Sequence, residues 1–155
     1  MKSILVLDNL RSSHNVGSCF RTADGVGVDF MYLVGITPLP HDSFGRSNKE
    51  IAKTALGAEK TVLWKHVASL ATLIKKLKKE GVCVFALEQS AVSQNIKTVQ
   101  LKQQWALIVG NEVTGIESKY LTQCDGVLEL PMRGTKESLN VSVAAGIALY
   151  QLAGL

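Results

Sequence analysis

Three short segments carry the glycines and polar side chains that could bind a ligand and act on it. They are Ser13–Asp24, Ile108–Glu117 and Leu130–Ala144. Each places small or polar residues just after an apolar run that predicts a strand, at the expected start of a helix. In open α/β sheets, ligands bind beyond the carboxyl ends of the strands. The three segments are therefore predicted to converge on one crevice.

The segment Leu130–Ala144 is the most informative of the three. Pro131 cannot donate to a sheet ladder, so it ends the preceding strand. Gly134 permits close approaches of the backbone, and Ser138 can cap the following helix. Free backbone N–H groups and the Asn140 amide would then face the turn, as the floor of a polar pocket. An ordinary strand–loop–helix connection explains this stretch equally well.

Several familiar sites are excluded by spacing. Gly110 and Gly115 are not followed by the Lys-Ser/Thr pair of a phosphate-binding P-loop. Gly25 and Gly27 lack the third glycine of a dinucleotide-binding fingerprint. The 3 histidines have no metal-ligand spacing, so no metal site is predicted, and there is no Gly-x-Ser-x-Gly elbow.

Composition is that of a globular chain. The 155 residues are 46% hydrophobic and 19% charged, and we expect them to form a single domain over residues 1–155. The net charge of +4 permits a polyanionic partner without requiring one. No apolar run approaches the roughly 20 residues that a membrane span needs. The 3 cysteines lie far apart, which favours reduced thiols and a cytoplasmic protein.

Apolar runs alternate with helical patterns along the chain. Strands are predicted at Ile4–Leu7, Phe30–Val34, Thr61–Leu63, Val82–Leu87, Trp105–Val109 and Val127–Leu130. Helices are predicted at His14–Gly25, Val67–Glu80, Ile116–Gln123 and Ser138–Ala153. This rhythm indicates an α/β fold, with a mainly parallel sheet covered by helices on both faces. Residues 36–58 are the least regular stretch, and we expect a mobile loop there.

The predicted last helix, Ser138–Ala153, is apolar nearly all round. Such a helix must be covered on more than one side. A homodimer interface explains this pattern, and a helix fully buried within one chain explains it equally well.

The three segments together resemble the SpoU/TrmH branch of the SPOUT methyltransferases. The motifs are Asn-x-Gly with an arginine six residues after the asparagine, Gly-Asn-Glu-x-x-Gly, and Pro-Met-x-Gly-x-x-x-Ser-Leu-Asn-Val-Ser-Val-Ala, starting at Asn15, Gly110 and Pro131. The last is the most specific, and the resemblance spans Leu7 to Leu152. It implies transfer of methyl from S-adenosylmethionine to ribose 2′-hydroxyls of RNA. It also implies a deep C-terminal trefoil knot and a homodimer whose active site uses both subunits.

The resemblance also assigns residues to roles. It implies that the cofactor contacts main chain at Leu87, Glu88, Gly110, Leu130, Met132 and Leu139. It implies that the catalytic group comprises Arg21, Asn15, Glu112, Ser138 and Asn140. Cations that we expect to touch the RNA backbone are Arg11, Arg46, Lys49, Lys53 and Arg133.

Each catalytic assignment has a structural alternative. Arg21 occupies the family's catalytic position; we expect it to bind phosphate and stabilise a developing oxyanion, although the family arginine has also been described as the base. Its alternative is a surface pair with Asp24. Asn15, Ser138 and Asn140 have helix capping as theirs. Glu112 would orient Asn15 or Arg21, but a carboxylate near a helix start is also favourable by itself.

Three functions follow in order of preference. The first is a tRNA 2′-O-methyltransferase, the second performs the same reaction on ribosomal RNA, and the third is a non-catalytic RNA-binding or assembly module with the same fold. The chain begins on the first predicted strand and stops with the last predicted helix. We therefore expect substrate recognition to depend on the core dimer or on a partner.

Overall fold

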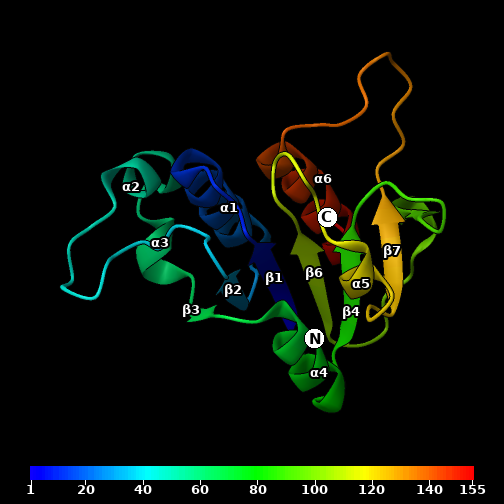
Figure 1. Cartoon of the computed structure of the whole chain (residues 1–155), viewed down its shortest axis with the longest axis horizontal. Coiled ribbons are helices and arrows are strands. Elements are labelled where there is room, and N and C mark those ends of the chain that lie inside the picture. The colour runs from blue at the N-terminus through cyan, green and yellow to red at the C-terminus, as the bar shows by residue number, and fades with distance from the viewer.

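The computed structural model describes residues 1–155 and contains one seven-stranded sheet in the order β3-β2-β1-β6-β4-β7-β5. Every neighbouring pair of strands is parallel (Figure 1). The strands are β1 Ser3–Asp8, β2 Phe30–Val34, β3 Trp64–Val67, β4 Cys83–Leu87, β5 Gln94–Asn95, β6 Trp105–Val109 and β7 Gly126–Glu129. The predicted α/β class with a mainly parallel sheet is confirmed.

Helices cover both faces of this sheet. They are α1 Ser13–Val26, α2 Lys49–Ala55, α3 Ala58–Thr61, α4 Leu70–Lys79, α5 Ser118–Leu121 and α6 Val141–Ala153, with a 3-10 turn at Ile96–Thr98. Residues of α1, α2, α3 and α6 share one buried cluster of 24 residues with the sheet. Residues of α4 form the second cluster, of 14 residues, on the opposite face. None of these helices combines the length and apolar character needed to span a membrane.

The central strands explain why the sheet is parallel and fully covered. Every residue of β1 and of β6 is buried, and apart from Ser3 and Asp8 at the ends of β1 these residues are apolar, without alternation. Leu5 and Leu7 of β1 point to the α1 and α6 side, whereas Ile4 and Val6 point to the α4 side. Strands buried on both faces are typical of parallel sheets between two helical layers.

The region after β2 differs most from the prediction. The expected strand Thr61–Leu63 is wrong, because Thr61 ends α3 and β3 lies at Trp64–Val67. The expected helix over 67–80 begins only at Leu70, where the Ser69 side chain accepts a hydrogen bond from the N–H of Thr72. The stretch 36–58 is not simply a loop, since it contains α2. Turn residues around these short elements hid their periodicity.

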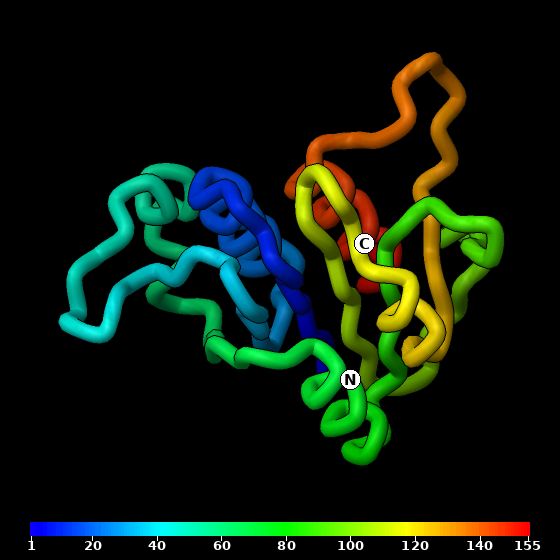
Figure 2. Tube along the Cα trace, viewed as in Figure 1, coloured from blue at the N-terminus to red at the C-terminus, as the bar shows by residue number.

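The C-terminal third also differs from the prediction. The predicted helix over 116–123 shortens to Ser118–Leu121. The last helix begins at Val141, with Asn140 as its N-cap, so the predicted capping role of Ser138 is wrong. Residues 131–140 instead form an extended loop that projects from the end of β7 before the chain returns to α6 (Figure 2). α6 packs against α1 and β6, which is consistent with the C-terminal knot; the knot itself stays a prediction.

Candidate active site

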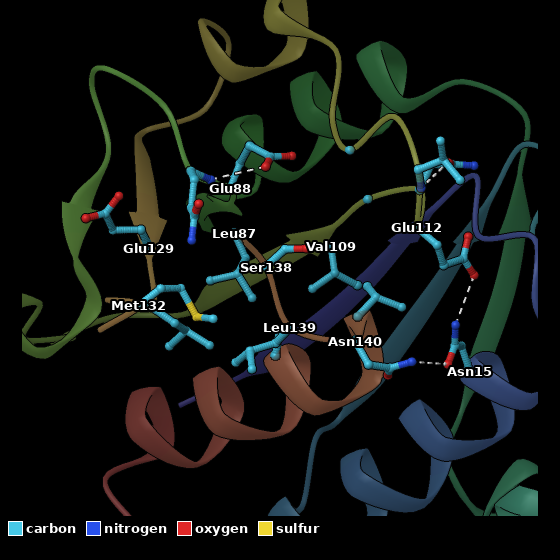
Figure 3. Close-up of a pocket in the computed structure, with 18 residues that line it drawn as sticks. Asn15, Leu87, Glu88, Val109, Glu112, Glu129, Met132, Ser138, Leu139 and Asn140 are labelled. Carbon is cyan, nitrogen blue, oxygen red and sulfur yellow. Dashed lines mark hydrogen bonds between the residues drawn. The ribbon is translucent and has the colours of Figure 1, made fainter. Parts of the chain in front are cut away.

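A cavity of about 500 Å³ lies at the carboxyl ends of β4, β6 and β7 (Figure 3). This size is typical of small-molecule sites. All six residues predicted to contact the cofactor line it, as do four of the five predicted catalytic residues. These ten are Asn15, Leu87, Glu88, Gly110, Glu112, Leu130, Met132, Ser138, Leu139 and Asn140. The predicted convergence of the three segments is therefore seen.

The cavity has apolar walls and acidic edges. Leu87, Leu130, Met132 and Leu139 provide apolar surface, which suits a flat aromatic base. Glu129, which no sequence argument had singled out, lines the cavity and accepts a hydrogen bond from Ser93 Oγ at 2.6 Å. Glu129 is the last residue of β7, and ligands bind beyond the carboxyl ends of parallel strands, so its position could have indicated a place in the cavity.

The Glu88 side chain has a positioning role besides the main-chain contact predicted for this residue. Its Oε2 accepts a hydrogen bond from the backbone N–H of Ile116 at 3.0 Å, and its Oε1 accepts one from Gln89 at 3.1 Å. The carboxylate thus ties the end of β4 to the loop between β6 and α5. The residue lines the cavity, but its side chain is already engaged in positioning that loop.

Gly110 is needed for a reason that the sequence did not reveal. A Cβ atom at this position would lie 2.6 Å from Ile116 Cγ1 and 2.7 Å from the carbonyl carbon of Gly115. The absence of a side chain therefore lets the loop between β6 and α5 fold back on itself. The resemblance implies a cofactor contact at Gly110, but the fold of this loop already requires glycine there.

Three polar side chains form a chain across the mouth of the cavity. Asn15 Nδ2 donates to Glu112 Oε1 at 3.2 Å, and Asn140 Nδ2 donates to Asn15 Oδ1 at 3.2 Å (Figure 3). Each comes from one of the three segments found in the sequence. The arrangement brings together residues about 100 or more positions apart, with Glu112 in contact with Asn15 as anticipated.

Glu112 is held by backbone donors at the start of α1. The N–H of Arg11 donates to Oε2 at 2.9 Å, and the N–H of Ser12 donates to Oε1 at 3.0 Å. Burial by itself would raise the pKa of Glu112, but the hydrogen bonds from Arg11, Ser12, its own backbone and Asn15 together lower it below the ordinary value. The carboxylate therefore stays charged, with both oxygens occupied.

The capping alternatives are resolved differently for each residue. Ser12, not Asn15, caps α1 by accepting from the N–H of Asn15 at 3.2 Å. Asn140 does cap α6: its Oδ1 accepts from the N–H and the hydroxyl of Ser142, at 2.9 and 2.6 Å. Its amide nitrogen remains available to contact Asn15. Ser138 lines the cavity without a hydrogen bond of its own.

Arg21 does not line the cavity of this chain. It is exposed on α1 and forms no ion pair, so the alternative pair with Asp24 is also absent. Helical geometry places it on the outer surface of α1, between the side that approaches α2 at Gly17 and the side that approaches α6 at Thr22. Within one chain, Arg21 therefore lies apart from the other four predicted catalytic residues.

The five predicted RNA contacts are all exposed but do not form one patch. Arg46 is paired with Asp42 at 2.7 Å, whereas the other four form no ion pair. Lys49 and Lys53 lie on α2, Arg11 precedes α1, and Arg133 lies on the projecting loop after β7. They therefore come from separate parts of the fold.

The cavity fits S-adenosylmethionine in its chemistry. An adenine would find apolar walls and strand-end main chain, as the resemblance implies. A cationic ligand would also meet the carboxylates of Glu88, Glu112 and Glu129 along the edges. Apolar surface combined with a few placed polar groups is the usual composition of a cofactor site.

Comparison with known proteins agrees with this geometry. Residues 2–150 match the SpoU rRNA Methylase family. A 23S rRNA (guanosine-2′-O-)-methyltransferase RlmB from Neisseria meningitidis is 35% identical over 96% of this chain and 56% of the relative. The AdoMet-bound rRNA methyltransferase from Sinorhizobium meliloti has a TM-score of 0.87 and 26% identity, covering 97% of this chain and 55% of that chain. The A. aeolicus TrmH/SpoU tRNA modifying enzyme has a TM-score of 0.84 and 29% identity, covering 99% and 74%.

The chain spans 56–58% of the length of the curated relatives that it matches. The family match nevertheless covers nearly all of the residues described, including every segment around the cavity. This chain belongs to the SpoU rRNA Methylase family.

Proposed function

We propose that this protein methylates a ribose 2′-hydroxyl of RNA with S-adenosylmethionine, and that its substrate is ribosomal RNA. The observation that carries the proposal is the cavity at the ends of β4, β6 and β7, where the hydrogen-bonded chain Glu112–Asn15–Asn140 meets the six predicted cofactor contacts. The 23S rRNA 2′-O-methyltransferase and the AdoMet-bound rRNA methyltransferase that match nearly the whole chain support the reaction class.

The residues around the cavity would bind and orient the two reactants. S-adenosylmethionine supplies a methyl group on a positively charged sulfur. The Asn15 and Asn140 amides would hold the acceptor ribose, and the hydrogen bond from Asn15 to Glu112 supports a role for Glu112 in fixing Asn15. Such positioning contributes up to about 7–11 kcal/mol in favourable cases. Because both Glu112 oxygens are already bonded and its pKa is lowered, we assign it to orientation rather than to proton removal.

Arg21 is proposed to act across a dimer. Val143, Ile147 and Tyr150 form an exposed apolar stripe on α6, beside the outer surface of α1 that carries Arg21. If a second copy covers this stripe, Arg21 lies near the boundary between subunits, where it can approach the partner's cavity. It would bind phosphate and stabilise the developing oxyanion, with phosphate or water accepting the proton.

The order of substrates changes from the sequence expectation. Sequence reasoning placed tRNA first, but the curated relatives are named as 23S rRNA methyltransferases, which favours ribosomal RNA. The tRNA reading stays as the second candidate because the A. aeolicus tRNA modifying enzyme is 29% identical and shares the fold. We also propose that residues 1–155 act as one domain, which the continuous sheet supports.

Transfer of labelled methyl to separated ribosomal RNA and tRNA tests the proposal. We expect a 2′-O-methylnucleoside in ribosomal RNA, located by nuclease digestion and mass spectrometry. Arg21→Ala should reduce transfer at least about 100-fold while cofactor affinity stays unchanged, because Arg21 does not line the cavity of its own chain. Label only in tRNA would favour the second candidate. Transfer to neither RNA, with RNA binding intact, would favour the non-catalytic module.

A further inference from the structure

An exposed aromatic ring marks the loop between β2 and α2. Phe44 is 82% exposed, whereas Phe20 and Phe85 are buried and Phe30 packs against the second core cluster. The loop lies at the outer edge of the molecule beside α2 (Figure 1). A ring this exposed gains little from burial, and it is free to contact a ligand.

The loop that carries Phe44 is held in one conformation. Asp42 Oδ1 accepts hydrogen bonds from the N–H groups of Phe44 and Arg46, both at 2.9 Å. The backbone adds Gly45 N–H to Asp42 O at 3.0 Å, and Gly45 takes a positive φ of 77° that favours glycine. The pKa of Asp42 is lowered, chiefly by the backbone hydrogen bond from Arg46, so these bonds persist at neutral pH. A ring on such a turn loses little freedom on binding.

A cation lies against the same ring. The guanidinium carbon of Arg46 is 5.2 Å from the centre of the Phe44 ring. Its Nε is paired with Asp42 at 2.7 Å, while its two terminal nitrogens form no hydrogen bond. Lys49 and Lys53 follow on the adjacent helix α2, neither of them in an ion pair. The loop thus combines an open π-face with unpaired N–H donors.

The loop is also fixed relative to the cavity. Asn48, the N-cap of α2, donates to Ser13 Oγ at 3.0 Å, and Thr54 Oγ1 donates to the carbonyl of His14 at 3.0 Å. A Cβ at Gly17 would collide with Thr54 Oγ1, so α1 and α2 are in close contact. Since Asn15 of α1 lines the cavity, the position of the loop is set by the same rigid frame.

We propose that Phe44 and Arg46 form a stacking site for an unpaired base of the RNA substrate, with the terminal nitrogens of Arg46 and the ammonium groups of Lys49 and Lys53 contacting the adjoining phosphates. This inference rests on the proposed RNA substrate and adds a second contact outside the cavity. A ring stacks on any exposed base, but bases within a duplex present no free face. The site therefore selects single-stranded RNA over double-stranded RNA.

Fluorescence anisotropy with a labelled 12-nucleotide oligouridylate and a 12-base-pair RNA duplex tests this inference. Phe44→Leu should weaken binding of the single strand about 10-fold, within the range expected for one lost stack, and leave duplex binding unchanged. Phe44→Tyr keeps the ring and should bind like the wild type. Val92→Ala, at an exposed apolar residue away from this loop, is the matched control and should also bind like the wild type.

The outcomes separate this inference from the proposed function. Equal single-strand affinity in Phe44→Leu and wild type would overturn the stacking site, as would an equal loss on the duplex or a wild type that binds no single strand. If methyl transfer is absent but the Phe44-dependent binding is seen, the stacking site stands and the enzymatic proposal falls. If transfer occurs while Phe44→Leu binds normally, the stacking site alone is wrong.

Discussion

At the scale of single residues, the site depends on how each carboxylate is solvated. Glu112 keeps its charge because backbone N–H groups of Arg11 and Ser12 replace the water that burial removes. Asp8, at the end of β1, is in the opposite situation. It is buried, and burial together with the charge of Glu117 raises its pKa from 3.8 to about 6. At neutral pH the Asp8 carboxylate is charged, and this charge lowers the free energy of unfolding.

Asp8→Asn should make the protein more stable at pH 7.5. The folded protein holds the Asp8 proton more tightly than the unfolded chain does. The stability that this proton contributes is therefore fully present below pH 3.8 and is lost as the pH rises through about 6. Removing the charge should recover about 1–3 kcal/mol at pH 7.5 and almost nothing at pH 4. Urea unfolding at the two pH values measures this difference.

Glu117→Gln is the companion variant for Asp8→Asn. Because burial is the larger cause of the raised pKa and Glu117 the smaller one, this change should produce a smaller gain in stability at pH 7.5. An Asp8→Asn protein that is less stable than the wild type at pH 7.5 would show that the ionised carboxylate is favourably solvated in the fold.

At the scale of elements, the loop between β6 and α5 is the most constrained part of the site. It carries Glu112, is folded tightly at Gly110, and is tied to β4 by Glu88. Gly115, also in this loop, takes a positive φ of 65°. The side chain that orients Asn15 is therefore positioned by a turn that tolerates few changes.

Gly110→Ala should destabilise this loop. The new Cβ would lie 2.6 Å from Ile116 Cγ1, and relieving such an overlap costs about 1–3 kcal/mol. We expect a lower melting temperature together with weaker binding of S-adenosylmethionine, both measured by thermal denaturation with and without the cofactor.

Gly134→Ala is the matched control for Gly110→Ala. A Cβ at Gly134 meets nothing within 4 Å, and its φ is not positive, so its stability should change by less than about 0.5 kcal/mol. The close approach expected of Gly134 from the sequence is not seen in this fold. If Gly110→Ala had unaltered stability and lost only cofactor binding, the ligand and not the loop would be the reason for glycine there.

At the scale of the whole molecule, one chain covers only one face of α6. Its inner face is buried against α1 and the sheet, through Ala145, Ala148, Leu149 and Leu152. Its outer face leaves Val143, Ile147 and Tyr150 about half exposed. Of the two explanations for the apolar helix, burial within one chain therefore accounts for one face only, and a homodimer is our proposal for the other.

Ile147→Asp should convert the proposed dimer into a monomer. Placing a charge in the centre of an apolar contact costs several kcal/mol when the charge stays unpaired. Sedimentation velocity measures the oligomeric state, and circular dichroism checks that the fold is kept. Leu63→Asp, at an exposed leucine between α3 and β3, should leave the dimer intact. A wild type that sediments as a monomer at micromolar concentration would contradict the proposal.

Loss of the dimer should also affect catalysis in a specific way. If Arg21 acts in the partner's cavity, mixing Arg21→Ala protein with a variant defective in its own cavity should restore part of the transfer. Ile147→Asp should then lose transfer while it keeps cofactor affinity, because the cavity is built within one chain.

The sequence by itself determined the elements whose signals are local. Uninterrupted apolar runs gave the limits of β2 and β6 without error, because a strand buried on both faces needs no partner information to be recognised. Glycines and polar residues just after strands predicted that the three segments meet, since the ends of parallel strands lie at one edge. The six predicted cofactor contacts came from the family resemblance, and all six line the cavity. The short helices α2 and α3 were not predicted, because 7 and 4 residues are too few to show a helical period of apolar residues.

Only the tertiary structure decided which side chains meet. The contacts Asn15–Glu112 and Asn140–Asn15 join positions that no local pattern relates, and they depend on how α1 and α6 pack over the sheet. The same packing leaves Arg21 outside the cavity, although its spacing from Asn15 matches the family. Spacing along a chain fixes a residue's place on its own helix, whereas its distance from another element depends on the packing between them.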